Sequence, residues 1–209
     1  MPIEYEVISE VVDIRNDTPI GGDVFFVDSN IWYWIAYSRP SSGDNPPAKY
    51  QLSSYSSYIN KILNTELNQP KLYFCDFSLA ELAHLIEQTE YEIYNRMASS
   101  EIKKKEYRHK CPAERSKVIK EIKTAWGQVE KLAKSIGIDS LSTQSVLSRI
   151  ANQPIDGYDS FIIECVIKGG IAKILTDDSD YVSTPGMQIF TANKNVIESA
   201  KNQNRLVVR

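Results

Sequence analysis

The stretch Val24-Phe-Phe-Val-Asp-Ser-Asn30 predicts the fold class of this chain. The four consecutive apolar residues 24–27 are typical of a short central strand that is buried on both faces of a parallel sheet. A helix is expected directly afterwards, at residues 31–37. Asp28 ends the strand, and open parallel sheets bind their ligands at this carboxyl edge.

Strand and helix signals alternate along the rest of the chain. Short apolar runs predict strands at residues 71–75, 171–175 and 187–190. Helical spacing predicts helices at 48–67, from Ser78 onward, near 143–150 and at 157–168. This alternation favours an α/β fold with a mainly parallel sheet. Residues 1–23 precede the first strong signal and are interpreted as an N-terminal arm or an edge strand.

The composition is that of an ordinary soluble globular protein. The 209 residues are 42% hydrophobic and 24% charged, which is enough to form one sizeable core. Cys75, Cys111 and Cys165 form no metal-binding or disulfide pattern, as is usual in a reducing compartment. The chain shows neither a secretory signal nor a long apolar segment, so we expect a cytoplasmic protein with no membrane contact.

A basic helical segment stands out from the net charge of −3. Residues 101–134 contain eleven Lys or Arg and five Glu, and apolar residues recur there at helical spacing. A solvated helix face is the ordinary role of such charges, and attraction of a nucleic-acid backbone is the functional alternative. The candidate RNA-binding residues are Lys103, Lys104, Lys105, Arg108, Lys110, Lys117 and Lys120.

Acidic residues occur at four separated places that the predicted fold could bring together. Asp28 follows the first core strand, and Glu81 lies near the start of a helix. Asp159 lies in the first turn of helix 157–168, and Asp178 and Asp180 follow strand 171–175. The carboxyl ends of parallel strands meet at one edge of a sheet, where carboxylates can share a divalent metal ion.

Several of these acids also have a purely structural interpretation. Asp28 could cap the following helix, and Ser78-Leu-Ala-Glu81 matches the capping box. Asp156 is interpreted as the N-cap of helix 157–168. Clustered carboxylates after strand 171–175 repel one another unless a cation neutralises them, and we favour Asp178 and Asp180 over Asp177 as the inward pair.

Taken together, the motifs resemble the PIN-domain family of metal-dependent nucleases, close to its VapC-like toxins. The resemblance rests on V-D-S-N with Asp28, S-L-A-E-L with Glu81, Y-D-S-F-I-I-E with Asp159 and L-T-D-D-S-D-Y with Asp178. It implies a three-layer α/β/α domain at residues 24–209 with a central mainly parallel sheet and a basic helical insert at about 95–137. It also implies these residue roles: a catalytic quartet of Asp28, Glu81, Asp159 and Asp178, with Asp180 as a further metal ligand and Asn30 and Thr176 in support.

The resemblance implies a divalent-metal-dependent endoribonuclease that acts as the toxin of a toxin–antitoxin pair. Carboxylate oxygens suit Mg²⁺ or Mn²⁺, and one or two such ions can promote hydrolysis of an RNA phosphodiester. An antitoxin protein and a second copy of the chain are the expected partners. Trp32, Tyr33, Trp34 and Tyr37 are candidates to stack an unpaired base, although such aromatic residues more often pack in a core.

Three other functions remain open at this point. The chain could be a non-catalytic RNA-binding or assembly module with the same fold, or a nuclease that cleaves DNA. A phosphotransferase of the haloacid-dehalogenase kind would need a second Asp two residues after Asp28, where this chain has Asn30.

Overall fold

The computed structural model describes residues 5–66, 68–98, 102–137 and 142–209. Within these residues one sheet runs in the order β4-β3-β2-β5-β6-β1-β7, and each pair of neighbours is parallel. The strands are β1 (Glu10–Asp13), β2 (Val24–Val27), β3 (Lys71–Cys75), β4 (Lys134–Ile136), β5 (Lys173–Leu175), β6 (Gln188–Thr191) and β7 (Leu206–Val207). The predicted parallel sheet is therefore confirmed.

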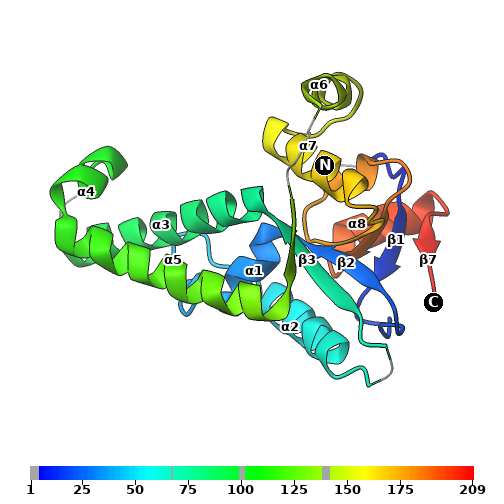
Figure 1. Cartoon of the computed structure of the whole chain (residues 1–209), viewed down its shortest axis with the longest axis horizontal. Helices are drawn as coiled ribbons and strands as arrows, with labels where there is room; N and C mark the ends of the chain where they lie inside the picture. The colour runs from blue at the N-terminus through cyan, green and yellow to red at the C-terminus, as the bar shows by residue number, and fades with distance from the viewer. Residues whose placement is uncertain (1–4, 67, 99–101, 138–141) are drawn as a thin grey trace.

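Helices cover both faces of this sheet (Figure 1). They are α1 (Ser29–Ala36), α2 (Lys49–Leu63), α3 (Asp76–Ala98), α4 (Lys104–Lys110), α5 (Pro112–Leu132), α6 (Thr143–Asn152), α7 (Gly157–Lys168) and α8 (Lys194–Asn202), with two 3₁₀ turns, η1 (Pro40–Ser42) and η2 (Asp180–Ser183). Side chains of α1, α2, α3 and α5 pack on one face, and those of α7 and α8 pack on the other. The predicted three-layer α/β/α architecture is confirmed.

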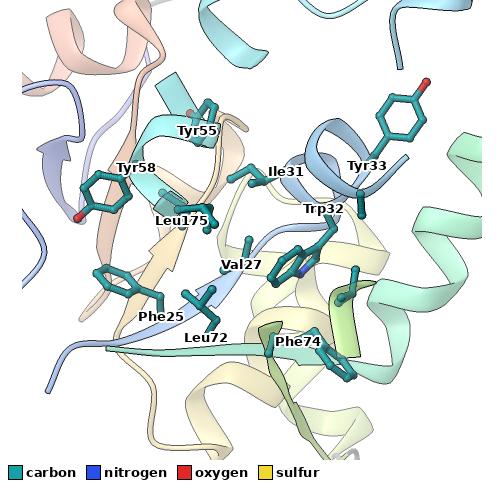
Figure 2. Packing of buried hydrophobic residues seen from close by; sticks show 14 of the residues in the cluster. Phe25, Val27, Ile31, Trp32, Tyr33, Tyr55, Tyr58, Leu72, Phe74 and Leu175 are labelled. Carbon is teal, nitrogen blue, oxygen red and sulfur yellow. The ribbon is translucent and has the colours of Figure 1, made fainter. Parts of the chain in front are cut away.

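The alternation of side chains along β2 explains why its apolar run is unbroken. Phe25 and Val27 point into the core beneath α1 and α2, whereas Phe26 points into the core beneath α7. All three side chains are fully buried. Figure 2 shows Val27 between Trp32 and Leu175, and Phe25 next to Leu72, in the first of these cores. A strand with helices on both faces requires apolar residues at every position.

Two predictions about the elements are wrong in detail. Residues Glu10–Asp13 form β1, which pairs with β6 on one side and β7 on the other, so it is an interior strand and not an edge strand. Helix α3 begins at Asp76, two residues before the predicted start at Ser78.

The basic segment forms a helical arm. Helix α5 packs along α3, and the pair extends beyond the sheet with α4 at its far end (Figure 1). The chain then returns to the sheet as β4, which pairs with β3. Among the helices of the described residues, none combines the length and the apolar character needed to cross a bilayer.

Trp32 provides a test of the core. Its side chain is fully buried, and within the described residues its indole N–H has no hydrogen-bond partner. We expect Trp32→Ala to lower the free energy of unfolding by about 3–5 kcal/mol, because it leaves a large cavity. Trp32→Phe should cost much less, because it keeps most of the apolar volume and removes an unpaired donor. Urea unfolding followed by circular dichroism measures both, and equal losses would contradict this expectation.

Candidate active site

A pocket of about 510 Å³ opens at the carboxyl edge of the sheet, between the first turns of α1 and α7 and the N-terminal half of α3. It is lined by Asp28, Ser29, Asn30, Ala80, Glu81, His84, Leu85, Asp156, Tyr158, Asp159 and Asp178. The structure therefore brings the four carboxylates of the predicted quartet into one pocket, together with Asn30. They come from four segments that are up to 150 residues apart, from 28 to 178.

Asp28 lies deepest among these acids, with 3% of its surface exposed. Its backbone N–H donates to the carbonyl of Leu175, which extends the pairing of β2 with β5 up to the pocket. The Thr176 hydroxyl donates to Asp28 Oδ2 over 2.8 Å. Although Asp28 occupies the N-cap position of α1, its side chain accepts no capping hydrogen bond, so the capping interpretation is wrong here.

Glu81 is held by a side chain from a different helix. The Ser29 hydroxyl, at the start of α1, donates to Glu81 Oε2 over 2.6 Å. The predicted capping box is absent, because Ser78 lies inside α3 and its hydroxyl accepts from the N–H of Cys75 at 3.3 Å. The ordinary structural explanation of Glu81 is therefore wrong, and its carboxylate is available at the pocket.

Asp159 is oriented from two sides. The Tyr181 hydroxyl donates to its Oδ1 over 2.9 Å, and its own N–H donates to Asp156 Oδ1 over 2.9 Å. Asp156 is thus the N-cap of α7, as predicted from the sequence. Ser29 and Tyr181 lie within two of the quoted motifs, but the sequence alone indicates no role for either, because each contacts an acid that is distant in sequence and close only in the fold.

The acidic loop after β5 divides its carboxylates between two tasks. Asp178 reaches the pocket, and its N–H donates to Thr176 Oγ1 over 2.9 Å, so Thr176 joins Asp178 to Asp28. Asp180 begins η2 and donates its N–H to Asp178 Oδ1, but it does not line the pocket. Asp178 and Asp180 are therefore not an equivalent inward pair.

Asp177 has a structural task on the other side of this loop. Its carboxylate accepts hydrogen bonds from Tyr50, Gln51 and Tyr55, over 2.6–3.0 Å. These three donors belong to α2, so Asp177 joins that helix to the end of β5. Asp177 does not line the pocket, which agrees with the prediction that it is not one of the inward pair.

Burial and mutual repulsion raise the pKa of three carboxyl groups in the pocket. Burial, reinforced by Asp178, raises the pKa of Asp28 to about 7. Loss of water around Glu81 raises its pKa to about 7, with repulsion from Asp159 adding to the effect. Burial and the nearby Asp28 likewise raise the pKa of Asp159 to about 7. Such shifts concentrate at functional sites, because burial and like charges are brought together there for catalysis or ligand binding.

The donor set of the pocket fits a hard divalent cation. Its charged lining residues are all carboxylates, and oxygen ligands of this kind suit Mg²⁺ or Mn²⁺. In the part of the chain that the structure describes, no three acidic, cysteine or histidine side chains are grouped closely enough to enclose an ion as they stand. A cation would therefore have to draw the carboxylates together, replacing their mutual repulsion by attraction.

The aromatic residues after Asp28 do not form a base-stacking surface. Trp32, Tyr33 and Tyr37 are 0–7% exposed and pack in the core, and Trp34 packs against Tyr55 with ring centroids 5.4 Å apart. That interpretation is wrong for the three buried rings, because α1 is covered by α2 on one side and by α3 and α5 on another. His84, by contrast, is exposed at the rim of the pocket.

The predicted basic contacts fall into two groups. Several are already engaged: Arg108 binds Glu87 through Nε at 2.9 Å and through Nη2, and Lys104 donates to Gln88 over 2.7 Å. Lys110 and Lys117 pair with acids of their own helices. Lys103, Lys105 and Lys120 are exposed, and their ammonium groups meet no partner among the described residues. The last group contributes free positive charge to the helical arm.

Arg115, another residue of the basic segment, lies with Arg108 beside the pocket. Its Nη1 donates to Glu87 Oε1 over 2.8 Å, so two guanidinium groups share one buried carboxylate and leave a net positive charge. A second hollow contains both arginines, and it shares Ala80 and His84 with the acidic pocket. A positively charged surface therefore adjoins the acidic pocket.

Comparison with known proteins adds little to this geometry. No model of a known protein family matches the sequence, and no curated protein matches it. A crystal structure of VapBC2 from Rickettsia felis, bound to a DNA fragment from its promoter, includes a chain with 12% identity and a TM-score of 0.45. That match covers 79% of this chain and 96% of the other. A likeness at this level carries no conclusion about activity or partners.

The raised pKa of Asp28 predicts a pH dependence of stability in the metal-free protein. Between about pH 4 and pH 7 the folded chain binds a proton at Asp28 that the unfolded chain has released. Stability from this group is therefore lost as the pH rises through that range and stays low above it. Asp28→Asn removes the effect, so the unfolding free energy of the variant relative to the unsubstituted chain should rise by about 1–3 kcal/mol between pH 5 and pH 8.

Urea titrations at several pH values measure this difference. Asp44→Asn is the matched control, because the Asp44 side chain is 65% exposed on the surface. A pH-independent difference for Asp28→Asn would contradict the proposed burial of its charge.

Proposed function

We propose that this chain is a divalent-metal-dependent endoribonuclease of the PIN type. The observation that carries the proposal is the convergence of Asp28, Glu81, Asp159 and Asp178 in one pocket at the carboxyl edge of a parallel sheet. The raised pKa values of three of these acids indicate a pocket that is poorly stable without a cation. The sequence motifs that resemble this family supply the same four residues.

In this proposal Asp28, Glu81, Asp159 and Asp178 hold Mg²⁺ or Mn²⁺, with Asp180 as an outer acid. The ion supplies Lewis-acid stabilisation of the charge that develops on a phosphodiester. The residues around the quartet fix its geometry: Thr176 orients Asp28, Ser29 orients Glu81 and Tyr181 orients Asp159. Asn30, at the pocket wall, can donate to a phosphate oxygen or to a carboxylate.

Substitution of Asp28 tests the catalytic part of the proposal. We expect Asp28→Asn and Asp178→Asn each to lower the rate of RNA cleavage by at least about 100-fold, equivalent to about 2.7 kcal/mol of transition-state stabilisation. The assay follows end-labelled RNA with the full chain and Mn²⁺. Asp44→Asn is the control and should cleave at the rate of the unsubstituted chain.

Three outcomes of this assay would decide against the proposal. If the unsubstituted protein binds Mn²⁺ in calorimetry yet leaves RNA intact, the non-catalytic RNA-binding or assembly role is favoured. If Asp28→Asn cleaves at an undiminished rate, the quartet is not the site. If the chain cuts a DNA strand of the same sequence and leaves RNA intact, the DNA-directed alternative replaces the present one.

The helical arm is proposed to hold the RNA backbone. Free ammonium groups on the arm, among them those of Lys103, Lys105 and Lys120, offset the repulsion between a polyanion and the acidic pocket. Lys104, Arg108, Lys110 and Lys117 bind acids or amides of the protein and shape the arm. Arg108 retains 44% of its side-chain surface and can also reach a phosphate.

Salt dependence of binding measures this contribution. We expect the triple substitution of Lys103, Lys105 and Lys120 by Ala to weaken binding of single-stranded RNA and to reduce the slope of log K against log salt by about 2. The matched control replaces Lys71, Lys201 and Arg205 by Ala, because these residues are also exposed but lie outside the arm, at the start of β3 and around the end of α8. An equal effect of the two triple substitutions would show that only net charge matters.

The toxin role rests on the resemblance to VapC-like toxins, which implies an antitoxin partner and a homodimer. A small DNA-binding protein encoded beside this gene that inhibits the cleavage would support it. Without such a neighbour, a role in RNA processing is favoured.

A further inference from the structure

An aromatic hollow adjoins the acidic pocket on the side away from the arginines. It has a volume of about 450 Å³ and is lined by Phe77, Asp156, Gly157, Tyr158 and Phe161. Phe77 belongs to the first turn of α3, and the other four come from the N-cap and first turns of α7. Neither the proposed metal chemistry nor the core of the protein requires this hollow.

The three rings of the hollow form one cluster. Phe77 lies edge-on to Tyr158, with ring centroids 5.9 Å apart, and it is tilted against Phe161 at 5.6 Å. Phe77 also packs against the core beneath α7, so it fixes the cluster to the body of the protein. Tyr158 nevertheless remains 49% exposed, although its ring contacts that of Phe77. Its exposed surface is therefore available to a ligand.

The order of the three hollows suggests what this ligand is. The acidic pocket shares Asp156 and Tyr158 with the aromatic hollow, and it shares Ala80 and His84 with the hollow that contains Arg108 and Arg115. The aromatic and basic hollows share no residue. The acidic pocket therefore lies between them, and α3 connects all three over residues 77–87, about 15 Å of helix.

The lining of the aromatic hollow favours a base over a phosphate. No basic residue lines it, and its one charged residue is the carboxylate of Asp156, which repels a phosphate. A carboxylate can accept hydrogen bonds from the exocyclic amino groups of bases, and aromatic rings stack on bases of any sequence. A base and its phosphate are joined through one sugar, so adjoining hollows suit adjoining parts of a nucleotide.

We propose that Phe77, Tyr158 and Phe161 form a subsite that stacks an unpaired nucleobase next to the phosphodiester in the acidic pocket. This inference rests on the proposed nuclease function and adds a preference for single-stranded substrate, because a paired base cannot enter the hollow. Tyr158 is the contacting ring, and it packs against Phe77, which is itself packed against Phe161. The adjoining phosphates on the other side lie toward Arg108 and Arg115.

Binding of a single-stranded RNA that carries one 2-aminopurine tests the subsite. The full chain is used with the Asp28→Asn substitution, so that the RNA stays intact. Anisotropy reports affinity, and quenching of 2-aminopurine fluorescence reports stacking. We expect Tyr158→Ala to weaken binding about tenfold and to abolish the quenching, whereas Tyr158→Phe should preserve both.

Ile167→Ala is the matched control, because Ile167 is a 41% exposed apolar residue on the same helix, remote from the hollow. It should change neither signal, and thermal unfolding confirms that each variant is folded. The inference is overturned if Tyr158→Ala binds and quenches like its parent, or if the parent itself never quenches the probe. It is also overturned if Tyr158→Ala leaves RNA binding intact but prevents binding of a protein partner, since the hollow would then be a protein-docking site.

The assay separates this inference from the proposed function, because it requires no cleavage. If the chain binds and quenches the probe through Tyr158 but never cleaves RNA, the nuclease proposal is wrong and the subsite is supported. If the chain cleaves RNA equally well with and without the Tyr158 ring, and with equal preference for single strands, the subsite is wrong and the nuclease proposal stands.

Discussion

The structure depends on one electrostatic constraint: several carboxylates converge where a buried parallel strand ends. Asp28 is placed there by the pairing of β2 with β5, and Asp178 and Asp159 approach it from the next strand and from α7. Burial, with mutual repulsion adding to it, raises the pKa of three of these acids to about 7. The surrounding fold therefore has to supply enough stability to hold these acids together, and a cation would convert that cost into binding energy.

Hydroxyl groups orient three of the four carboxylates of the quartet in the pocket. Ser29, Thr176 and Tyr181 each donate one hydrogen bond to one acid of the pocket. A hydroxyl can rotate to suit its partner, and it is uncharged. It can therefore orient a carboxylate without neutralising it. An arginine in the same place would neutralise the acid and remove the attraction for a cation.

Buried carboxylates also organise the helical arm, but with the opposite outcome. Glu87 of α3 is paired with Arg108 and Arg115, and these bonds lower its pKa. Three residues further along α3, Glu90 accepts from Tyr37 and Arg39. One helix thus presents an unneutralised acid at Glu81 and neutralised acids farther out. That difference separates a candidate ligand site from structural ion pairs.

The sequence by itself determined the layered α/β fold, most of its elements and the four acids of the pocket. These features follow from local periodicity and from the fixed direction of parallel strands, which places Asp28 and Asp178 at one edge. Only the tertiary structure decided how each acid is used. Ser78-Leu-Ala-Glu81 reads as a capping box, but Glu81 binds Ser29, which is 52 residues away. The aromatic residues after Asp28 are in the core, and the exposed ring is Tyr158, because side-chain exposure depends on which helices pack together and local sequence does not encode that packing.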